Sequence, residues 1–132
     1  MQFPSAEWAA AFREALNEND AYREAAKAWE GDITFLVRTA DPNVPAPGIH
    51  LEFAHGQCTA ATFHDDARNV SSEFVYEGTP ENWQKLIRHE LDPLKAVLDG
   101  TFRVRGNLAK LMRFTRAAKE LVETASNVPV TP

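Results

Sequence analysis

The stretch Glu90–Val122 reads ELDPLKAVLDGTFRVRGNLAKLMRFTRAAKELV, and it decides the fold of this chain. Its pattern predicts a short helix, a tight turn, a strand, a second tight turn and a long helix. Gly100 ends the short helix, because a residue without Cβ readily takes the left-handed conformation that closes a helix. Residues 101–105, TFRVR, alternate apolar and basic side chains, which is typical of a strand with one buried face.

Gly106 and Asn107 turn the chain into the long helix, in which apolar residues share one sector and Arg113 and Arg116 lie opposite. The apolar sector consists of Leu108, Leu111, Phe114, Thr115, Ala118, Leu121, Val122 and Ala125. Asp92-Pro93 begins the short helix, with Asp92 as its cap, and the inward side of that helix consists of Leu94, Val97 and Leu98. Three elements therefore present apolar faces in immediate succession, and each face needs a partner on which to pack.

The preceding part of the chain supplies that partner, since it contains four further segments with strand patterns. They are residues 33–37, 49–53, 57–64 and 73–78. His55-Gly56 is the predicted hairpin turn between the second and third of these strands, and the polar residues 64–72 form a crossing loop.

Three more helices are predicted from capping residues and apolar spacing. Ser5 caps the first, which runs to about Asn17, and Gly31 ends the second. The third begins at Thr79-Pro80, where threonine caps and proline occupies the first helical position. Its inward side consists of Trp83, Leu86 and Ile87.

The length of 132 residues suits one domain, which we expect to span residues 1–132. The order of elements predicts an α+β fold, with a five-stranded, mainly antiparallel sheet and helices packed on one face. The net charge of −5 argues against nucleic acid as a partner, because nucleic-acid binders carry a basic surface.

The run DPLKAVLDGTFRVRGNLAKLMR, residues 92–113, resembles the C-terminal half of the sterol carrier protein 2 (SCP2) family of lipid-binding domains. FVYEGTPENWQKLIRHELDP, residues 74–93, resembles the middle helix of that family. AAKAWEGDITFLV, residues 25–37, resembles its single-domain bacterial members. The resemblance implies a central first strand, a crossing connection after the third strand, and an apolar cavity between helices and sheet.

The family resemblance further implies non-catalytic binding or transfer of a hydrophobic, lipid-like ligand. Candidate ligands are a fatty acid, fatty acyl-CoA, phospholipid, isoprenoid or sterol, and a chain of about 14 methylenes would contribute about 11 kcal/mol gross. Release would follow local movement of the last helix or of the C-terminal tail. The candidate ligand-binding residues are Trp83, Leu86, Ile87, Leu94, Val97, Leu98, Phe102, Val104, Leu108, Leu111, Met112, Phe114 and Leu121.

Three alternatives remain open at this point. Taken without the resemblance, the apolar stripes are more typical of a dry core, because periodicity alone does not reveal a void. The chain could also be an accessory subunit or chaperone for a pathway with hydrophobic intermediates such as quinones, as some bacterial relatives of the resembled family are. A third alternative is an enzyme that acts on a bound lipid, whose signature would be a buried group with a perturbed pKa.

Basic residues are concentrated between Thr101 and Lys119, a segment with no acidic residue. This cluster favours a solvated outer face, but it could also contact an anionic ligand or, transiently, a membrane. Lys110 lies nearest the turn before the long helix and is the candidate anion contact.

Other chemistry has little support in the sequence. Cys58 has no basic neighbour, which favours a small core residue over a nucleophile. The four histidines lack the spacing of a zinc site, so we predict no metal, no cofactor and no catalytic residue. No apolar run approaches the ~20 residues that span a bilayer, and the N-terminus lacks a secretory signal, so we expect a cytoplasmic protein.

Overall fold

A computed structural model describes residues 1–130 of the chain. Helices and strands follow each other in the order α1-α2-β1-β2-β3-β4-α3-α4-β5-α5-α6. The helices are α1 (Ala6–Asn17), α2 (Asp20–Ala25), α3 (Pro80–Ile87), α4 (Pro93–Leu98), α5 (Leu108–Met112) and α6 (Thr115–Asn127). The strands are β1 (Glu30–Val37), β2 (Gly48–Ala54), β3 (Gln57–His64), β4 (Phe74–Gly78) and β5 (Arg103–Arg105).

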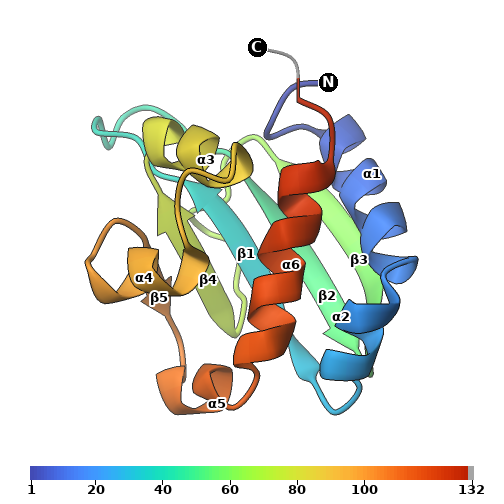
Figure 1. The fold of residues 1–132 in the computed structure, drawn as a ribbon. Coiled ribbons are helices and arrows are strands. Elements are labelled where there is room, and N and C mark those ends of the chain that lie inside the picture. The colour runs from blue at the N-terminus through green and yellow to red at the C-terminus, as the bar shows by residue number, and fades with distance from the viewer. Residues whose placement is uncertain (131–132) are drawn as a thin grey trace.

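The five strands form one sheet in the order β3-β2-β1-β4-β5, so the first strand is central (Figure 1). Only the pair of β1 and β4 is parallel, and the connection between β3 and β4 crosses the sheet to reach that position. The predicted α+β class, the mainly antiparallel sheet and the crossing connection are confirmed.

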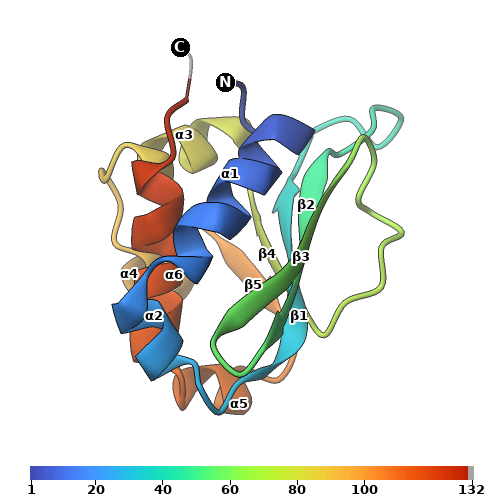
Figure 2. The same ribbon diagram turned by 90° about the vertical axis from the view of Figure 1, so that its right-hand side faces the viewer.

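Helices cover one face of the sheet, and loops cover the other (Figure 2). On the helical face, α6 runs across the middle of the sheet and α1 lies over β3 (Figure 1). The main core lies between these layers, around the fully buried Trp8, Phe12, Trp83 and Phe102. A much smaller cluster of Leu36, Ala46 and Ala67 lies under the loops on the other face.

The predicted helix starts are confirmed, because each is fixed by a local hydrogen bond. The Ser5 hydroxyl accepts from the backbone of Trp8, and Thr79 and Asp92 cap α3 and α4. The His55-Gly56 turn is also confirmed, with φ values of 52° and 85° that suit a tight hairpin. Among residues 1–130, every helix is too short or too polar to span a membrane.

The predicted end of the second helix at Gly31 is wrong, since α2 ends at Ala25 and Gly31 lies inside β1. Gly31 has φ +141°, and a Cβ there would come within 2.8 Å of a carboxylate oxygen of Glu73. The glycine is therefore needed because Glu73 approaches the strand closely, and it does not end the helix.

The predicted long helix is also wrong, because the chain breaks at Arg113 and Phe114 into the separate helices α5 and α6. At the break, the ring of Phe114 packs edge-on against Trp29, with ring centroids 5.0 Å apart. Turning Phe114 inward redirects α5 away from the axis of α6. As a result α5 has no buried residue, whereas α6 has five.

Candidate functional site

An apolar cavity lies between α6, the α4–β5–α5 segment and the helical face of the sheet. The sheet contributes Ile33, Phe35, Phe74, Val75, Tyr76 and Val104 to its wall. The helices and their connections contribute Tyr22, Trp29, Pro93, Leu94, Val97, Leu111, Phe114, Ala117, Ala118, Lys119, Leu121 and Val122. Ala117 and Ala118 leave space above the sheet, because α6 presents only methyl groups there.

Aromatic rings fix the floor of the cavity. Trp29 contacts Phe74 with ring centroids 5.4 Å apart, and Tyr76 stacks on Phe102 at 4.8 Å. The Tyr76 hydroxyl donates to the carbonyl oxygen of Pro93 at 3.3 Å, which ties β4 to the start of α4. These contacts give the floor a fixed shape that a ligand does not have to organise.

The two phenol groups in the wall stay neutral. Burial raises the pKa of both Tyr22 and Tyr76, and the nearby Asp92 raises the pKa of Tyr76 further. Both phenols are therefore uncharged at neutral pH, and the wall offers carbon surface with two hydroxyl groups. Such a surface suits hydrocarbon, and the charged residue in its lining, Lys119, lies at the rim.

The cavity is small in the closed structure, at about 70 Å³. A water molecule needs about 10–15 Å³ of such space, so the cavity accommodates about six methylene-sized groups. Burying six methylenes yields about 5 kcal/mol gross, which is close to the minimum cost of association. A chain of 14 methylenes thus needs more room than the closed structure offers.

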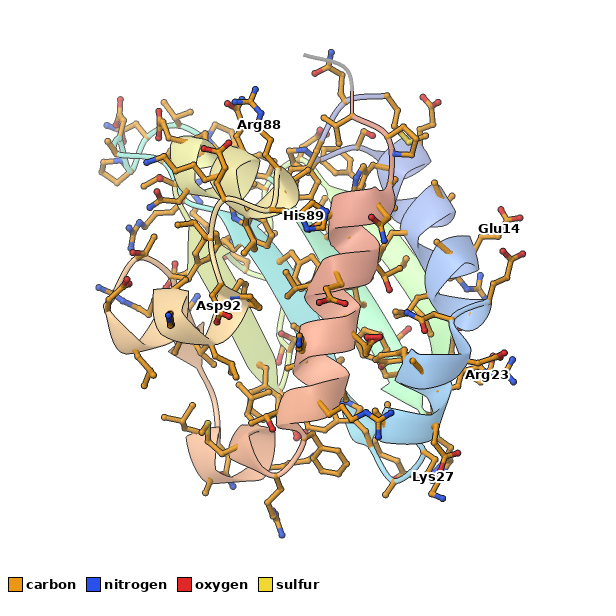
Figure 3. All side chains as sticks on the ribbon, in the orientation of Figure 1. Glu14, Arg23, Lys27, Arg88, His89 and Asp92 are labelled. Carbon is orange, nitrogen blue, oxygen red and sulfur yellow. The ribbon has the colours of Figure 1, made fainter. Side chains whose placement is uncertain are left out.

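A polar surface hollow of about 290 Å³ lies beside the cavity and shares Pro93, Lys119 and Val122 with it. Figure 3 shows Asp92 at the start of α4 and His89 between α3 and α6, and both residues line this hollow. Three carboxylates, those of Glu90, Asp92 and Glu123, accompany the single ammonium of Lys119. The hollow therefore has an excess of negative charge.

Of the predicted ligand-binding residues, the structure brings six together around the cavity. They are Leu94, Val97, Val104, Leu111, Phe114 and Leu121. Three more are buried in the core outside it, namely Trp83, Leu86 and Phe102. The Trp83 indole N–H donates to the carbonyl oxygen of Leu36 at 2.9 Å, so this side chain holds α3 on the sheet.

The remaining predicted residues lie outside the cavity. Ile87 is half-buried on α3, whereas Leu98 is 83%, Leu108 49% and Met112 52% exposed. Leu98 ends a six-residue helix whose only buried residue is Ala96, so its side chain has no layer to pack against. Leu108 and Met112 are exposed because the break at Phe114 rotates α5 relative to α6.

Apart from Val104, sequence reasoning missed the sheet and N-terminal side of the cavity, notably Trp29, Phe74 and Tyr76. A usable signal was present for Ile33 and Phe35, because period-two spacing places them on one face of β1. No local signal existed for Trp29, which follows α2 in a turn and reaches the cavity only through the tertiary fold.

Lys110, the predicted anion contact, already has partners in the structure. Its ammonium group forms an ion pair with Glu73, donates to the carbonyl oxygen of Glu30 at 2.9 Å and lies 4.8 Å from the ring centroid of Trp29. An anionic ligand would have to displace Glu73 to reach it. Among the other basic residues, Lys119 lies at the cavity rim, and Arg113 and Arg116 are exposed.

The remaining reactive side chains show no catalytic arrangement. Burial raises the pKa of the Cys58 thiol to about 11, so it is protonated at neutral pH. Within residues 1–130, no group of three or more His, Cys, Asp or Glu side chains could hold a metal ion. The charged Glu14, Arg23 and Lys27 project outward from the α1–α2 edge (Figure 3).

Comparison with known proteins gives a consistent result. The family model for the SCP-2 sterol transfer family matches residues 11–119. A crystal structure of sterol carrier protein 2 is similar at 32% identity and TM-score 0.89, covering 97% of this chain and 100% of that one. A conserved hypothetical protein of Thermus thermophilus is similar at 33% identity and TM-score 0.86, covering 100% of this chain and 93% of that one.

A more distant similarity shows the fold alone. Palmitated SCP2L2 of Aedes aegypti has 11% identity and TM-score 0.59, with 88% of this chain and 95% of that chain covered. The comparison with curated proteins gives no match.

Proposed function

The chain belongs to the SCP-2 sterol transfer family, and we propose that it binds and transfers a lipid-like molecule without chemically altering it. The observation that carries this proposal is the cavity between α6 and the sheet, whose wall is almost entirely carbon. Each methylene buried there contributes about 0.8 kcal/mol, so affinity depends on chain length and needs no catalytic group.

Ligand entry is proposed to occur by displacement of α4 and α5. Only Ala96 is buried in α4 and no residue is buried in α5, whereas α6 has five buried residues on the sheet. Elements with few buried contacts open at the lowest free energy. This burial pattern favours movement of α4 and α5 over the movement of the last helix that the sequence suggested.

The head group of the ligand is proposed to be uncharged. The polar hollow beside the cavity, which we propose as its entrance, carries three carboxylates against Lys119. Asp92 has a pKa below its ordinary value because the backbone N–H groups of Lys95 and Leu94 donate to it. Asp92 is therefore ionised at neutral pH. A carboxylate head group would meet repulsion there, while a hydroxyl or ester would not.

The decisive experiment examines protein purified from cells. Extraction into organic solvent followed by mass spectrometry should release a hydrophobic molecule in near-stoichiometric amount. Delipidated protein should then bind palmitate, and the methyl ester of palmitate more tightly. Ligand at 100 times its Kd should add about 2.7 kcal/mol to the free energy of unfolding, which raises Tm by about 10 °C.

Two results would count against these proposals in different ways. Clean spectra together with no Tm shift by palmitate, its ester or a long-chain alcohol would refute lipid binding. Tighter binding of the carboxylate than of its ester would refute only the uncharged head group, because the acyl chain of both probes is the same.

A further inference from the structure

A second hollow, of about 450 Å³, lies on the loop-covered face of the sheet, away from the lipid cavity. Figure 2 shows this face, where only loops lie over the strands. Charged residues dominate the hollow, namely Arg38, Arg68, Arg103, Arg105 and Glu77, above an apolar floor that includes Leu36.

Strand register assembles this cluster from distant parts of the chain. Glu77 on β4 pairs with Leu36 on β1 and with Arg103 on β5, so the three side chains form one row across the sheet. Arg105 lies on the same face, two residues further along β5, because side chains alternate along a strand. The Glu77 carboxylate is buried, at 7% exposure, and lies 3.5 Å from Nε of Arg105.

The charges in the hollow do not cancel. Arg68 is satisfied by Asp66 and by the carbonyl oxygen of Pro42 at 2.6 Å, and Arg105 is paired with Glu77. Within residues 1–130, the guanidinium groups of Arg38 and Arg103 make no hydrogen bond or ion pair, although Arg38 is half-buried. Two guanidinium groups in one hollow thus lack an anionic partner.

We propose that this hollow binds a phosphate-type oxyanion, held by Arg38 and Arg103. Guanidinium groups match the oxygen geometry of such anions through paired hydrogen bonds, which are stronger than those between neutral groups. Glu77 and Asp66 act as positioning residues, because they hold Arg105 and Arg68 at the rim. The oxyanion belongs either to a free small molecule or to a lipid head group, and the sheet separates it from the cavity.

The first experiment titrates wild-type protein with pyrophosphate at constant ionic strength, since screening by salt would otherwise change. Nuclear magnetic resonance should show shifts of the arginine Nε–H signals. In the double variant Arg38→Gln/Arg103→Gln, affinity should fall by at least about tenfold, the equivalent of one charge-assisted hydrogen bond. The matched control is Arg88→Gln/Arg116→Gln, which removes two charges from exposed positions, one directly after α3 and one on α6; Figure 3 labels Arg88.

The second experiment identifies the source of the oxyanion by sedimentation with phosphatidylcholine vesicles, with and without phosphatidic acid. Binding to the acidic vesicles that pyrophosphate inhibits and the Arg38/Arg103 variant lacks would assign a lipid head group. Pyrophosphate binding without vesicle binding would assign a free small molecule. Absence of both pyrophosphate binding and vesicle binding would overturn the proposal. An equal loss of affinity in the Arg38/Arg103 variant and in its control would also overturn it.

Discussion

Filling the cavity with a side chain of the protein should abolish ligand binding while the protein stays folded. Ala118 is the position of choice, because it lines the cavity from α6 and is half-buried. Ala118→Phe adds a ring of six carbon atoms. The cavity of about 70 Å³ accommodates about six groups of that size, so the ring occupies the space in place of the ligand.

The expected loss of binding free energy follows from the number of ligand methylenes that the ring excludes from the cavity. Loss of about six buried methylenes removes about 5 kcal/mol of binding free energy, equivalent to a loss of affinity of more than a thousandfold. Stability should change little, because the ring enters an existing void and overpacking is limited. We expect Tm of the ligand-free variant to stay within about 5 °C of the wild type.

The assay is displacement of a fluorescent fatty acid by palmitate methyl ester, with thermal unfolding measured in parallel. Ala10→Phe provides the matched control, since Ala10 is an exposed alanine on α1. It should bind as the wild type does. Affinity of Ala118→Phe within tenfold of the wild type, in a folded protein, would refute the assignment of the cavity as the binding site.

Three further predictions concern the cavity wall, the buried cysteine and the acid stability of the protein. Leu111→Glu should abolish binding because it places a charge in the cavity wall, whereas Met112→Glu should leave binding unchanged, since Met112 is 52% exposed; the fluorescent titration distinguishes them. Cys58, whose pKa burial raises to about 11, should react with a disulfide reagent at pH 8 only after urea unfolding. Burial alone would raise the pKa of Asp32, but hydrogen bonds from the Glu73 backbone and His50 lower it below its ordinary value. The ionised Asp32 carboxylate therefore stabilises the fold above about pH 4, and this contribution is lost on further acidification. In urea titrations, Asp32→Asn should have a lower free energy of unfolding than the wild type at pH 7. Its free energy of unfolding should also fall less steeply as the pH is lowered.

Local sequence signals predicted where the helices begin, because the hydrogen bonds that fix these positions join residues that are close in the sequence. Ser5, Thr79 and Asp92 each accept a hydrogen bond from the backbone two or three residues ahead, so the helix starts follow from the sequence. The family resemblance added the central first strand. The break at Phe114 was out of reach, since it depends on Trp29, 85 positions earlier in the chain.

The candidate site was predictable only in part, because a cavity forms where two packed layers of the protein do not touch. Periodicity showed that Leu94, Val97 and Leu111 face inward, but it did not show whether they touch the sheet. The exposure of Leu98 was likewise not predictable from its spacing. Its spacing is that of an inward residue, yet α4 ends there and no further layer lies beneath it.

Side chains alternate between the two faces of β4, which places the two proposed sites on opposite sides of the sheet and indicates that they act independently. Tyr76 lines the lipid cavity and its neighbour Glu77 lies in the arginine hollow, on opposite faces of the sheet. Coupling between the sites would require the backbone of β4 to shift, yet β4 is hydrogen-bonded to both β1 and β5. Saturation with palmitate methyl ester should therefore change pyrophosphate affinity by less than about twofold, and a larger change would show that ligand entry moves the sheet as well as α4 and α5.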